Sequence, residues 1–444
     1  MNILLILLGK LIRLLSSSLG LGSGSTWPGH IALSLNKNFI RGVLTTNDQR
    51  PKTILIAGTN GKTTTGKLIQ TILENNEKKV FQNQAGANLL NGIASALIQY
   101  STKLGRLNYD YAIFEVDENT LPLALTEFTP DFLILLNLFR DQLDRYGEVN
   151  IVASKWKKAI EQLNNPASGG AGQTILILNA DDPQIAYLSK SRKQKVFYFG
   201  LSDKEKGARV LAHASDSAYC PDCSSKLAYK KIFFSHLGIW KCTNCGLKRP
   251  TLDISDSPIF PLSGTYNKYN SLAAVLLAQL NNINNRTIEQ SLRQFKPAFG
   301  RQEIIKKGSK NIQIFLSKNP ASFNESLRTV YEQGAKTVLL VLNDRIPDGR
   351  DVSWIWDVDF ENFIDKFKNI ILSGDRAYDM GLRIKYSSSS EFQISNFKFQ
   401  IEENLKKAIQ LALEKTPKSE TLYILPTYSA MLEVRKILTG RKIL

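Results

Sequence analysis

Apolar and polar residues alternate in two different patterns along most of this chain of 444 residues. Short runs rich in β-branched and aromatic residues predict buried strands, and longer stretches with apolar residues three or four apart predict helices. Between about 50 and 200 we expect strands at 53–57, 78–82, 109–116, 131–137, 174–179 and 195–199. Strands that alternate with helices are typical of a parallel sheet covered on both faces. The sequence therefore predicts an α/β fold whose ligands lie at the carboxyl ends of the strands.

The last third of the chain shows the same alternation of predicted strands and helices, which predicts a second α/β unit. We expect its strands near 312–316, 337–342, 369–372 and 421–425. The predicted organisation has three parts: an N-terminal helix and linker at 1–50, a central domain at 51–300 and a C-terminal α/β domain at 301–444. A cysteine-containing insertion at about 216–251 interrupts the central domain.

The first residues form an apolar run that Lys10 and Arg13 interrupt. The run is too short to span a bilayer, and no cationic region precedes it. We expect an amphipathic helix from Leu4 to Leu15, followed by a flexible glycine- and serine-rich segment at 20–25. This helix packs on the body of the protein or touches a membrane surface. A signal peptide is the alternative.

The first central strand runs into a glycine-rich turn that opens a helix, Gly58-Thr59-Asn60-Gly61-Lys62-Thr63-Thr64. A turn of this kind directs backbone N–H groups and the positive end of a helix at one point, which suits a phosphate. Lys62 adds a cation, and Thr63 adds a hydroxyl for Mg²⁺. The two glycines lie closer together than in the Walker form. The sequence predicts a phosphate-binding loop, and a plain glycine-rich turn is the alternative.

The third strand ends in the acidic sequence Glu115-Val116-Asp117-Glu118. Carboxylates at the end of a buried parallel strand lie beside such a loop and can hold Mg²⁺ directly or through water. Glu115 is closest to the strand and is our first candidate, while a solvated acidic loop is the alternative.

Four cysteines form two Cys-x₂-Cys pairs with 18 residues between them: Cys220, Cys223, Cys242 and Cys245. This spacing is typical of one tetrahedral Zn²⁺ held by four thiolates, which leaves no position for a reactive water. We predict a structural zinc ribbon. The net charge of +17 favours acidic partners, so a ribbon that binds nucleic acid is the rival interpretation.

The segment from Asn137 to Gly147 resembles the Mur ligase family, which carries an Asp-His-Leu-Asp-Arg sequence at this distance from a Gly-Thr-Asn-Gly-Lys-Thr-Thr loop. Gln142 replaces the histidine that helps to organise a metal site in members that add amino acids. The glutamine form, together with an inserted Cys₄ ribbon, resembles the MurT type of the family. That type is the synthetase subunit of lipid II isoglutaminyl synthase.

The resemblance implies roles for four further residues. Lys155 matches a lysine that is often carbamylated and supports Mg²⁺, and Asn267 matches an asparagine that binds adenine. Arg301 matches an arginine that reaches the γ-phosphate from the domain junction. Leu316 stands where other members have an aspartate that holds the ribose, so the ribose contacts are expected to differ.

The C-terminal segment Asp348-Gly349-Arg350-Asp351-Val352-Ser353-Trp354 resembles the part of MurT-type proteins that faces their glutaminase, GatD. There an aspartate completes a Cys-His-Asp triad in the partner. The resemblance points to Asp351 first and to Asp348 second. Turn-capping acids beside an aromatic core are the alternative.

The resemblance implies an ATP-dependent carbon–nitrogen ligase that uses ATP, Mg²⁺ and Zn²⁺. Its reaction amidates the α-carboxylate of D-glutamate in the lipid II stem peptide through an acyl phosphate, with ammonia from a GatD-type glutamine amidotransferase subunit in a heterodimer. The expected location is the cytoplasm, at the inner face of the membrane, and nucleic acid is not an expected partner. Two alternatives stay open: a Mur-type ligase that adds an amino acid, and a P-loop NTPase that binds nucleic acid through its ribbon.

Overall fold

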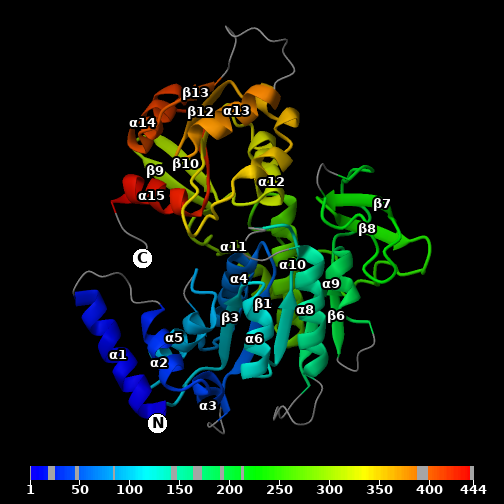
Figure 1. Cartoon of the computed structure of the whole chain (residues 1–444), viewed down its shortest axis with the longest axis vertical. Coiled ribbons are helices and arrows are strands. Elements are labelled where there is room, and N and C mark those ends of the chain that lie inside the picture. The colour runs from blue at the N-terminus through cyan, green and yellow to red at the C-terminus, as the bar shows by residue number, and fades with distance from the viewer. Residues whose placement is uncertain are drawn as a thin grey trace.

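The computed structural model describes residues 2–18, 26–45, 50–83, 86–141, 148–163, 173–190, 195–211, 215–387 and 399–440. Figure 1 shows two α/β bodies, one above the other, with a small hairpin at the side of the lower one. The predicted glycine-rich segment at 20–25 and Gln142 both lie outside the described residues.

The lower body is built on a parallel sheet in the order β2-β3-β1-β4-β5-β6. Its strands are β1 (Lys52–Ala57), β2 (Val80–Gln82), β3 (Tyr111–Val116), β4 (Phe132–Leu135), β5 (Ile175–Asn179) and β6 (Val196–Phe199). All six strands predicted between 50 and 200 are confirmed. Successive side chains of β1 point to opposite faces of the sheet, and each face has its own hydrophobic core. Leu55 packs in one of these cores and Ile54 in the other. Burial on both faces explains why these strands read as continuous apolar runs.

Helices cover both faces of this sheet. One face carries α5 (Leu90–Tyr100), α6 (Thr120–Glu127) and α8 (Val149–Gln162), and the other carries α4 (Lys62–Asn75), α10 (Thr265–Leu280) and α11 (Asn285–Arg293). A short helix, α9 (Pro183–Tyr187), follows β5, and Asp182 caps its first turn by accepting from the N–H of Gln184 and Ile185.

The N-terminal part forms three helices: α1 (Asn2–Ser18), α2 (Trp27–Leu35) and α3 (Phe39–Thr45). The predicted first helix is confirmed and is slightly longer than expected. Much of the stretch expected to be linker is helical, because Phe39, Ile40 and Val43 are buried against the central domain. No helix among the described residues has the length and apolar character needed to cross a bilayer.

The inserted segment folds as the antiparallel hairpin β7 (Leu227–Phe234) and β8 (Leu237–Cys242). It is anchored to the central domain, since the indole N–H of Trp240 donates to the carbonyl of Ala180 over 3.1 Å.

The upper body has a six-stranded sheet in the order β13-β12-β11-β14-β10-β9. Its strands are β9 (Arg301–Lys307), β10 (Lys310–Phe315), β11 (Thr337–Val341), β12 (Asn369–Ser373), β13 (Phe399–Ile401) and β14 (Thr421–Pro426). Its helices are α12 (Pro320–Glu332), α13 (Ala377–Ser387), α14 (Leu405–Lys415) and α15 (Tyr428–Thr439), with short 3₁₀ turns η2 (Ser353–Asp357), η3 (Phe360–Asn362) and η4 (Ile364–Lys366). The four predicted strands are confirmed. The two edge strands, β9 and β13, were not predicted, because β9 is mostly polar and β13 has only three residues.

Candidate active site

The predicted phosphate loop lies between β1 and α4, and its glycines hold conformations that other residues rarely adopt. Gly58 has φ +148° and Gly61 has φ +94°. A Cβ atom at Gly61 would lie 2.1 Å from Oδ1 of Asn270, and one at Gly58 would lie 2.9 Å from Cβ of Leu136. The loop is therefore packed so closely that only glycine fits at both positions.

The residues after β4 fix the shape of this loop. The backbone N–H of Thr59 donates to the carbonyl of Asn137 (3.0 Å), and the N–H of Asn60 donates to Oδ1 of the same residue (2.9 Å). The N–H of Phe139 donates to Oγ1 of Thr59 over 3.0 Å. These contacts bring the Asn137 segment and the loop together, although 77 residues separate Asn60 from Asn137.

Thr63 and Glu115 meet beneath the loop, where the hydroxyl of Thr63 donates to Oε2 of Glu115 over 2.6 Å. Glu115 is buried, and its Oε1 has no hydrogen-bond partner among the described residues. Burial raises the pKa of Glu115, and the Thr63 hydroxyl, Arg301 and Lys62 oppose that rise. A buried carboxylate oxygen without a partner, beside a threonine hydroxyl, is a donor set that suits Mg²⁺.

Lys62 begins α4 and folds back over the loop. Its Nζ contacts the carbonyl oxygen of Gly58 and lies 3.3 Å from that of Thr59. The same atom is 3.9 Å from Oε2 of Glu118, which is buried. The lysine thus places its positive charge beside the loop, and its role in binding phosphate stays a prediction.

The loop opens into a cavity of about 310 Å³ between the two α/β bodies. The central domain contributes the whole segment from Thr59 to Thr64, together with Glu115 and Asn267. The C-terminal domain contributes Arg301, Lys318 and Tyr428. The cavity therefore unites predicted residues that are far apart in the chain, and both domains are needed to complete it.

Arg301 is the first residue of β9 and lines this cavity. Its Nη1 donates to the carbonyl of Phe299 (2.9 Å). Burial lowers the pKa of Arg301, and the nearby Glu115 carboxyl opposes that shift. A guanidinium stays protonated in proteins, so Arg301 brings positive charge to the same cavity as Lys62.

Asn267 lies in the first turn of α10 and also lines the cavity. Its amide donates to the carbonyl of Ser263 (2.7 Å), and its Oδ1 accepts from the amide of Asn270 (3.1 Å). Leu316 borders the same cavity as an apolar wall.

Lys318 and Asp141 were missed by sequence reasoning. Lys318 follows β10, lines the cavity and contacts Oδ2 of Asp141. Asp141 is buried, and burial raises its pKa while Lys318 opposes that rise. Asp141 lies in the segment that resembles the Mur ligases, but no role was assigned to it or to Lys318, and no spacing rule connects two residues that are 177 positions apart.

Lys155 is not brought to the cavity. It is exposed on α8, whereas the neighbouring Trp156 is buried and donates its indole N–H to the carbonyl of Glu118 over 2.7 Å. Its role in supporting a metal stays a prediction.

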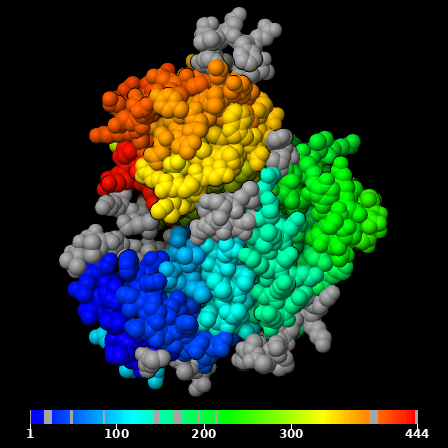
Figure 2. All heavy atoms as spheres, viewed as in Figure 1, coloured from blue at the N-terminus to red at the C-terminus, as the bar shows by residue number. Residues whose placement is uncertain are grey.

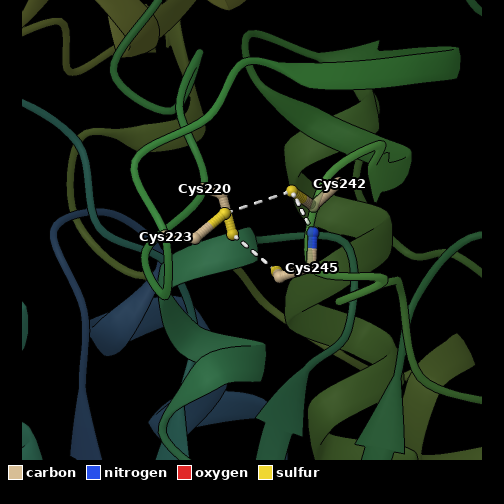
Figure 3. Close-up of side chains that lie close together, drawn as sticks. All are labelled: Cys220, Cys223, Cys242 and Cys245. Carbon is tan, nitrogen blue, oxygen red and sulfur yellow. Dashed lines mark hydrogen bonds between the residues drawn. The ribbon is translucent and has the colours of Figure 1, made fainter.

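The four cysteines converge, as Figure 3 shows, with their sulfur atoms turned toward one another. All four Sγ atoms lie within 4.8 Å of one another. Sγ of Cys220 is 3.6 Å from that of Cys245, and Sγ of Cys223 is 3.5 Å from that of Cys242. Four sulfur donors at this separation fit one tetrahedral metal ion.

The two candidate aspartates near the C-terminal domain surface differ in exposure. Asp351 is exposed, accepts from the backbone N–H of Ser353 (2.8 Å) and borders a shallow hollow with Trp356 and Arg376. Hydrogen bonding to Ser353 lowers the pKa of Asp351. Asp348 is buried and accepts from the backbone N–H of Ser429 over 2.8 Å, at the start of α15. Of the two carboxylates, that of Asp351 is the one exposed at the surface.

Comparison with known proteins gives two matching family models. The Mur ligase middle domain matches residues 56–278, and the MurT ligase C-terminal domain matches residues 316–431. The lipid II isoglutaminyl synthase (glutamine-hydrolyzing) subunit MurT of Staphylococcus aureus (strain COL) is 35% identical over 404 residues, which cover 85% of this chain and 86% of the relative. The subunit of the same name from Streptococcus pneumoniae (strain ATCC BAA-255 / R6) is 30% identical over 444 residues, 95% of this chain and 94% of the relative. The chain belongs to the MurT family.

A solved structure supports the fold of this MurT-family chain. A pseudomurein peptide ligase type C from Methanothermus fervidus superposes with a TM-score of 0.63 at 22% identity, covering 89% of this chain and 79% of that one. The middle-domain match includes the phosphate loop and Glu115, and the MurT C-terminal match includes Lys318 and Asp351. Arg301 lies between the two matched segments, where the two bodies meet.

Proposed function

We propose that this MurT-family chain is the ATP-using subunit of a lipid II isoglutaminyl synthase. It amidates the α-carboxylate of D-glutamate in the lipid II stem peptide and so forms D-isoglutamine. The observation that carries the proposal is the 30–35% identity to MurT subunits across at least 85% of the chain. The cavity lined by Lys62, Glu115 and Arg301 supports it. Two cations and a carboxylate that can hold Mg²⁺ are the groups that bind a nucleoside triphosphate.

The chemistry activates a carboxylate for attack by nitrogen. An oxygen of the substrate carboxylate attacks the γ-phosphorus of ATP, the bond to the β–γ bridging oxygen breaks, and ADP leaves. Ammonia then attacks the acyl carbon, the carbon–oxygen bond to phosphate breaks, and the nitrogen loses a proton to give the amide. Lys62 and Arg301 supply positive charge where negative charge builds up on the transferred phosphoryl group. Mg²⁺, held by Thr63 and Glu115, would neutralise phosphate charge.

The four cysteines would hold Zn²⁺ in a structural site. Four thiolates complete a tetrahedral coordination sphere, so a bound zinc ion would stabilise the hairpin and would not activate water.

The ammonia comes from a second subunit. Each of the four cysteines belongs to the ribbon, so none is left to serve as the nucleophile of a glutaminase. A GatD-type glutamine amidotransferase is the proposed partner, and Asp351 is the proposed contact. An exposed, ionised carboxylate can orient a histidine of a catalytic triad in the partner. The lipid-linked substrate places the reaction at the inner face of the membrane, and the net charge of +17 suits that anionic surface.

The test combines the purified chain with its glutaminase partner, lipid II, ATP and either glutamine or ammonium. We expect ADP release coupled to formation of D-isoglutamine, measured by mass spectrometry. Lys62→Ala is expected to abolish amidation and keep the wild-type Tm, while Lys67→Ala on the same helix serves as the matched control. Incorporation of an amino acid but never ammonia would identify an amino-acid-adding ligase. ATP turnover that depends on DNA or RNA would identify a nucleic-acid-dependent NTPase.

A further inference from the structure

The solvent-facing side of α1 consists entirely of leucine and isoleucine. Seven of its residues are between 39% and 71% exposed: Ile3, Leu4, Leu7, Leu8, Leu11, Leu14 and Leu15. At 3.6 residues per turn, these seven fall within an arc of roughly 140°. A surface helix normally turns its apolar stripe toward the core and its polar residues toward water. Here the apolar stripe faces outward.

The opposite side of α1 is firmly seated on the protein. Leu5 and Ile6 are buried, and a Cβ atom at Gly9 would lie 2.9 Å from the side chain of Ile98 in α5. Nζ of Lys10 donates to the carbonyl of Gln99 over 3.2 Å. Figures 1 and 2 show α1 in dark blue at the outer edge of the lower body, with α2 and α5 on its inner side. The orientation of the helix is therefore fixed, and its exposed leucines do not belong to the core.

Other exposed apolar side chains flank this face. Trp27, the first residue of α2, is 64% exposed, and Leu104 is 69% exposed. The loop that carries Leu104 adjoins α1, since a Cβ atom at Gly105 would lie 3.4 Å from Cδ1 of Ile6 and 3.6 Å from Cγ1 of Ile3. Exposed apolar side chains gathered on one helix and its neighbours mark a place where a membrane or another molecule binds. Tryptophan is enriched at the interface between a membrane and water.

The charges around the apolar face are positive. At 3.6 residues per turn Lys10 lies at the edge of the apolar arc and Arg13 further round the helix, and Lys103 precedes Leu104 in the adjoining loop. Burial, together with the charges of Arg13 and Lys103, lowers the pKa of Lys10. Residues 1–47 contain four lysines and arginines and no aspartate or glutamate. A second copy of the chain, docked through the same face, would bring these like charges together. An anionic lipid surface would instead attract them.

We propose that the outer face of α1, with Trp27 and Leu104, binds the surface of an anionic lipid bilayer. The helix lies in the plane of the membrane with its leucines in the acyl region and Lys10, at the edge of the apolar arc, nearest the headgroups, as interfacial amphipathic helices do. The inference deepens the proposed function, because it names the surface that brings the cavity to a lipid-linked substrate.

The test is co-sedimentation of the full chain with vesicles. One set contains only phosphatidylcholine, and the other contains phosphatidylcholine with phosphatidylglycerol. We expect binding to the anionic vesicles, weaker binding to the neutral ones, and release by high salt. The double variant Leu7→Glu/Leu11→Glu should bind anionic vesicles about tenfold more weakly, because it puts two charges on the apolar face. Leu382→Glu, at a leucine of α13 that is 49% exposed, is the matched control and should bind as the wild type does.

Three outcomes would overturn the inference. The first is a wild-type chain that stays in solution with anionic vesicles. The second is a double variant that binds them as tightly as the wild type. The third is a dimer, seen by sedimentation velocity, that only the double variant dissociates. Circular dichroism and Tm confirm that the variants are folded. Amidation of a water-soluble, lipid-free substrate separates this inference from the proposed function. The double variant should retain that activity, whereas its absence in the wild type would contradict the proposed function alone.

Discussion

The side-chain amides of Asn60 and Asn319 exchange two hydrogen bonds across the boundary between the two bodies. Nδ2 of Asn319 donates to Oδ1 of Asn60 over 3.2 Å, and Nδ2 of Asn60 donates to Oδ1 of Asn319 over 3.4 Å. Asn60 belongs to the phosphate loop, and Asn319 is the N-cap residue of α12 in the C-terminal domain. This pair therefore connects the phosphate loop of the central domain directly to the start of α12 in the C-terminal domain.

Removing this pair should weaken catalysis more than stability. Asn319→Ser keeps a side-chain oxygen for the N-cap of α12 but is too short to reach Asn60. We expect kcat/KM for ATP to fall about three- to tenfold, which corresponds to the roughly 0.5–1.5 kcal/mol of a net hydrogen bond. Steady-state ADP release measures this, and Tm should stay near the wild-type value. Asn319→Ala is the comparison variant, since it should also lose about 1 kcal/mol of stability with the cap. Wild-type kcat/KM in Asn319→Ser would mean that the contact has no catalytic consequence.

Asp351→Asn should separate the two nitrogen sources. An amide cannot hold a partner histidine in the tautomer that a catalytic triad needs, so the glutamine-driven rate should fall by roughly 10²–10⁴-fold. The ammonium-driven rate should stay within about twofold, because Asp351 is exposed and does not line the ATP cavity. Amide formation is measured with each nitrogen source in the presence of the partner.

Asp348→Asn is the contrasting variant for this experiment. Its carboxylate is buried and caps the start of α15, so we expect a lower Tm rather than a selective loss of glutamine use. Equal loss of both rates in Asp351→Asn would assign its carboxylate to the synthetase and not to the partner.

Loss of the proposed zinc ion should loosen the end of β4 as well as the hairpin. Arg140, which follows β4, donates from Nε to Asp216 at the base of the insertion (2.5 Å). We expect Cys242→Ser to bind no zinc, by elemental analysis, and to lose about 2 kcal/mol or more of stability, a fall of roughly 4–8 °C in Tm. Chelation should lower the Tm of the wild type and leave that of the variant unchanged. Thr243→Ala, in the same turn, is the control, and a wild-type protein that purifies without metal would contradict the prediction.

Glu325 should make stability depend on pH. It is buried on α12, where burial raises its pKa to about 7 from an ordinary value of 4.5. Arg328 Nη1 lies 2.8 Å from its Oε1 and opposes the rise. Because the folded state binds this proton more tightly than the unfolded state does, its contribution is fully present below pH 4.5 and is lost as the pH rises through 7.

Glu325→Gln should therefore gain Tm relative to the wild type as the pH increases from 5 to 8. Thermal unfolding across that range measures the difference. Glu289→Gln, at a partly exposed glutamate of α11 that pairs with Arg293, is the control and should show no such increase. A difference that stays constant with pH would show that Glu325 is ionised throughout.

The sequence predicted the parts of this molecule that depend on local patterns. The buried strands appear as apolar runs, and the phosphate loop appears as glycines between a strand and a helix. Contacts between distant residues could not be predicted, and Lys318 with Asp141 is the clearest case. The exposure of Lys155 depends on the rotation of α8, in which Val152 and Trp156 face inward. Sequence resemblance alone does not predict how this helix is rotated about its axis.

The cavity has walls from two sheets that fold from separate stretches of chain. A cut between α11 and β9 would leave Lys62, Thr63 and Glu115 on one fragment and Arg301 and Lys318 on the other. Neither fragment would contain all the charged groups that line the cavity. Turnover therefore depends on how the two domains meet as much as on either domain alone.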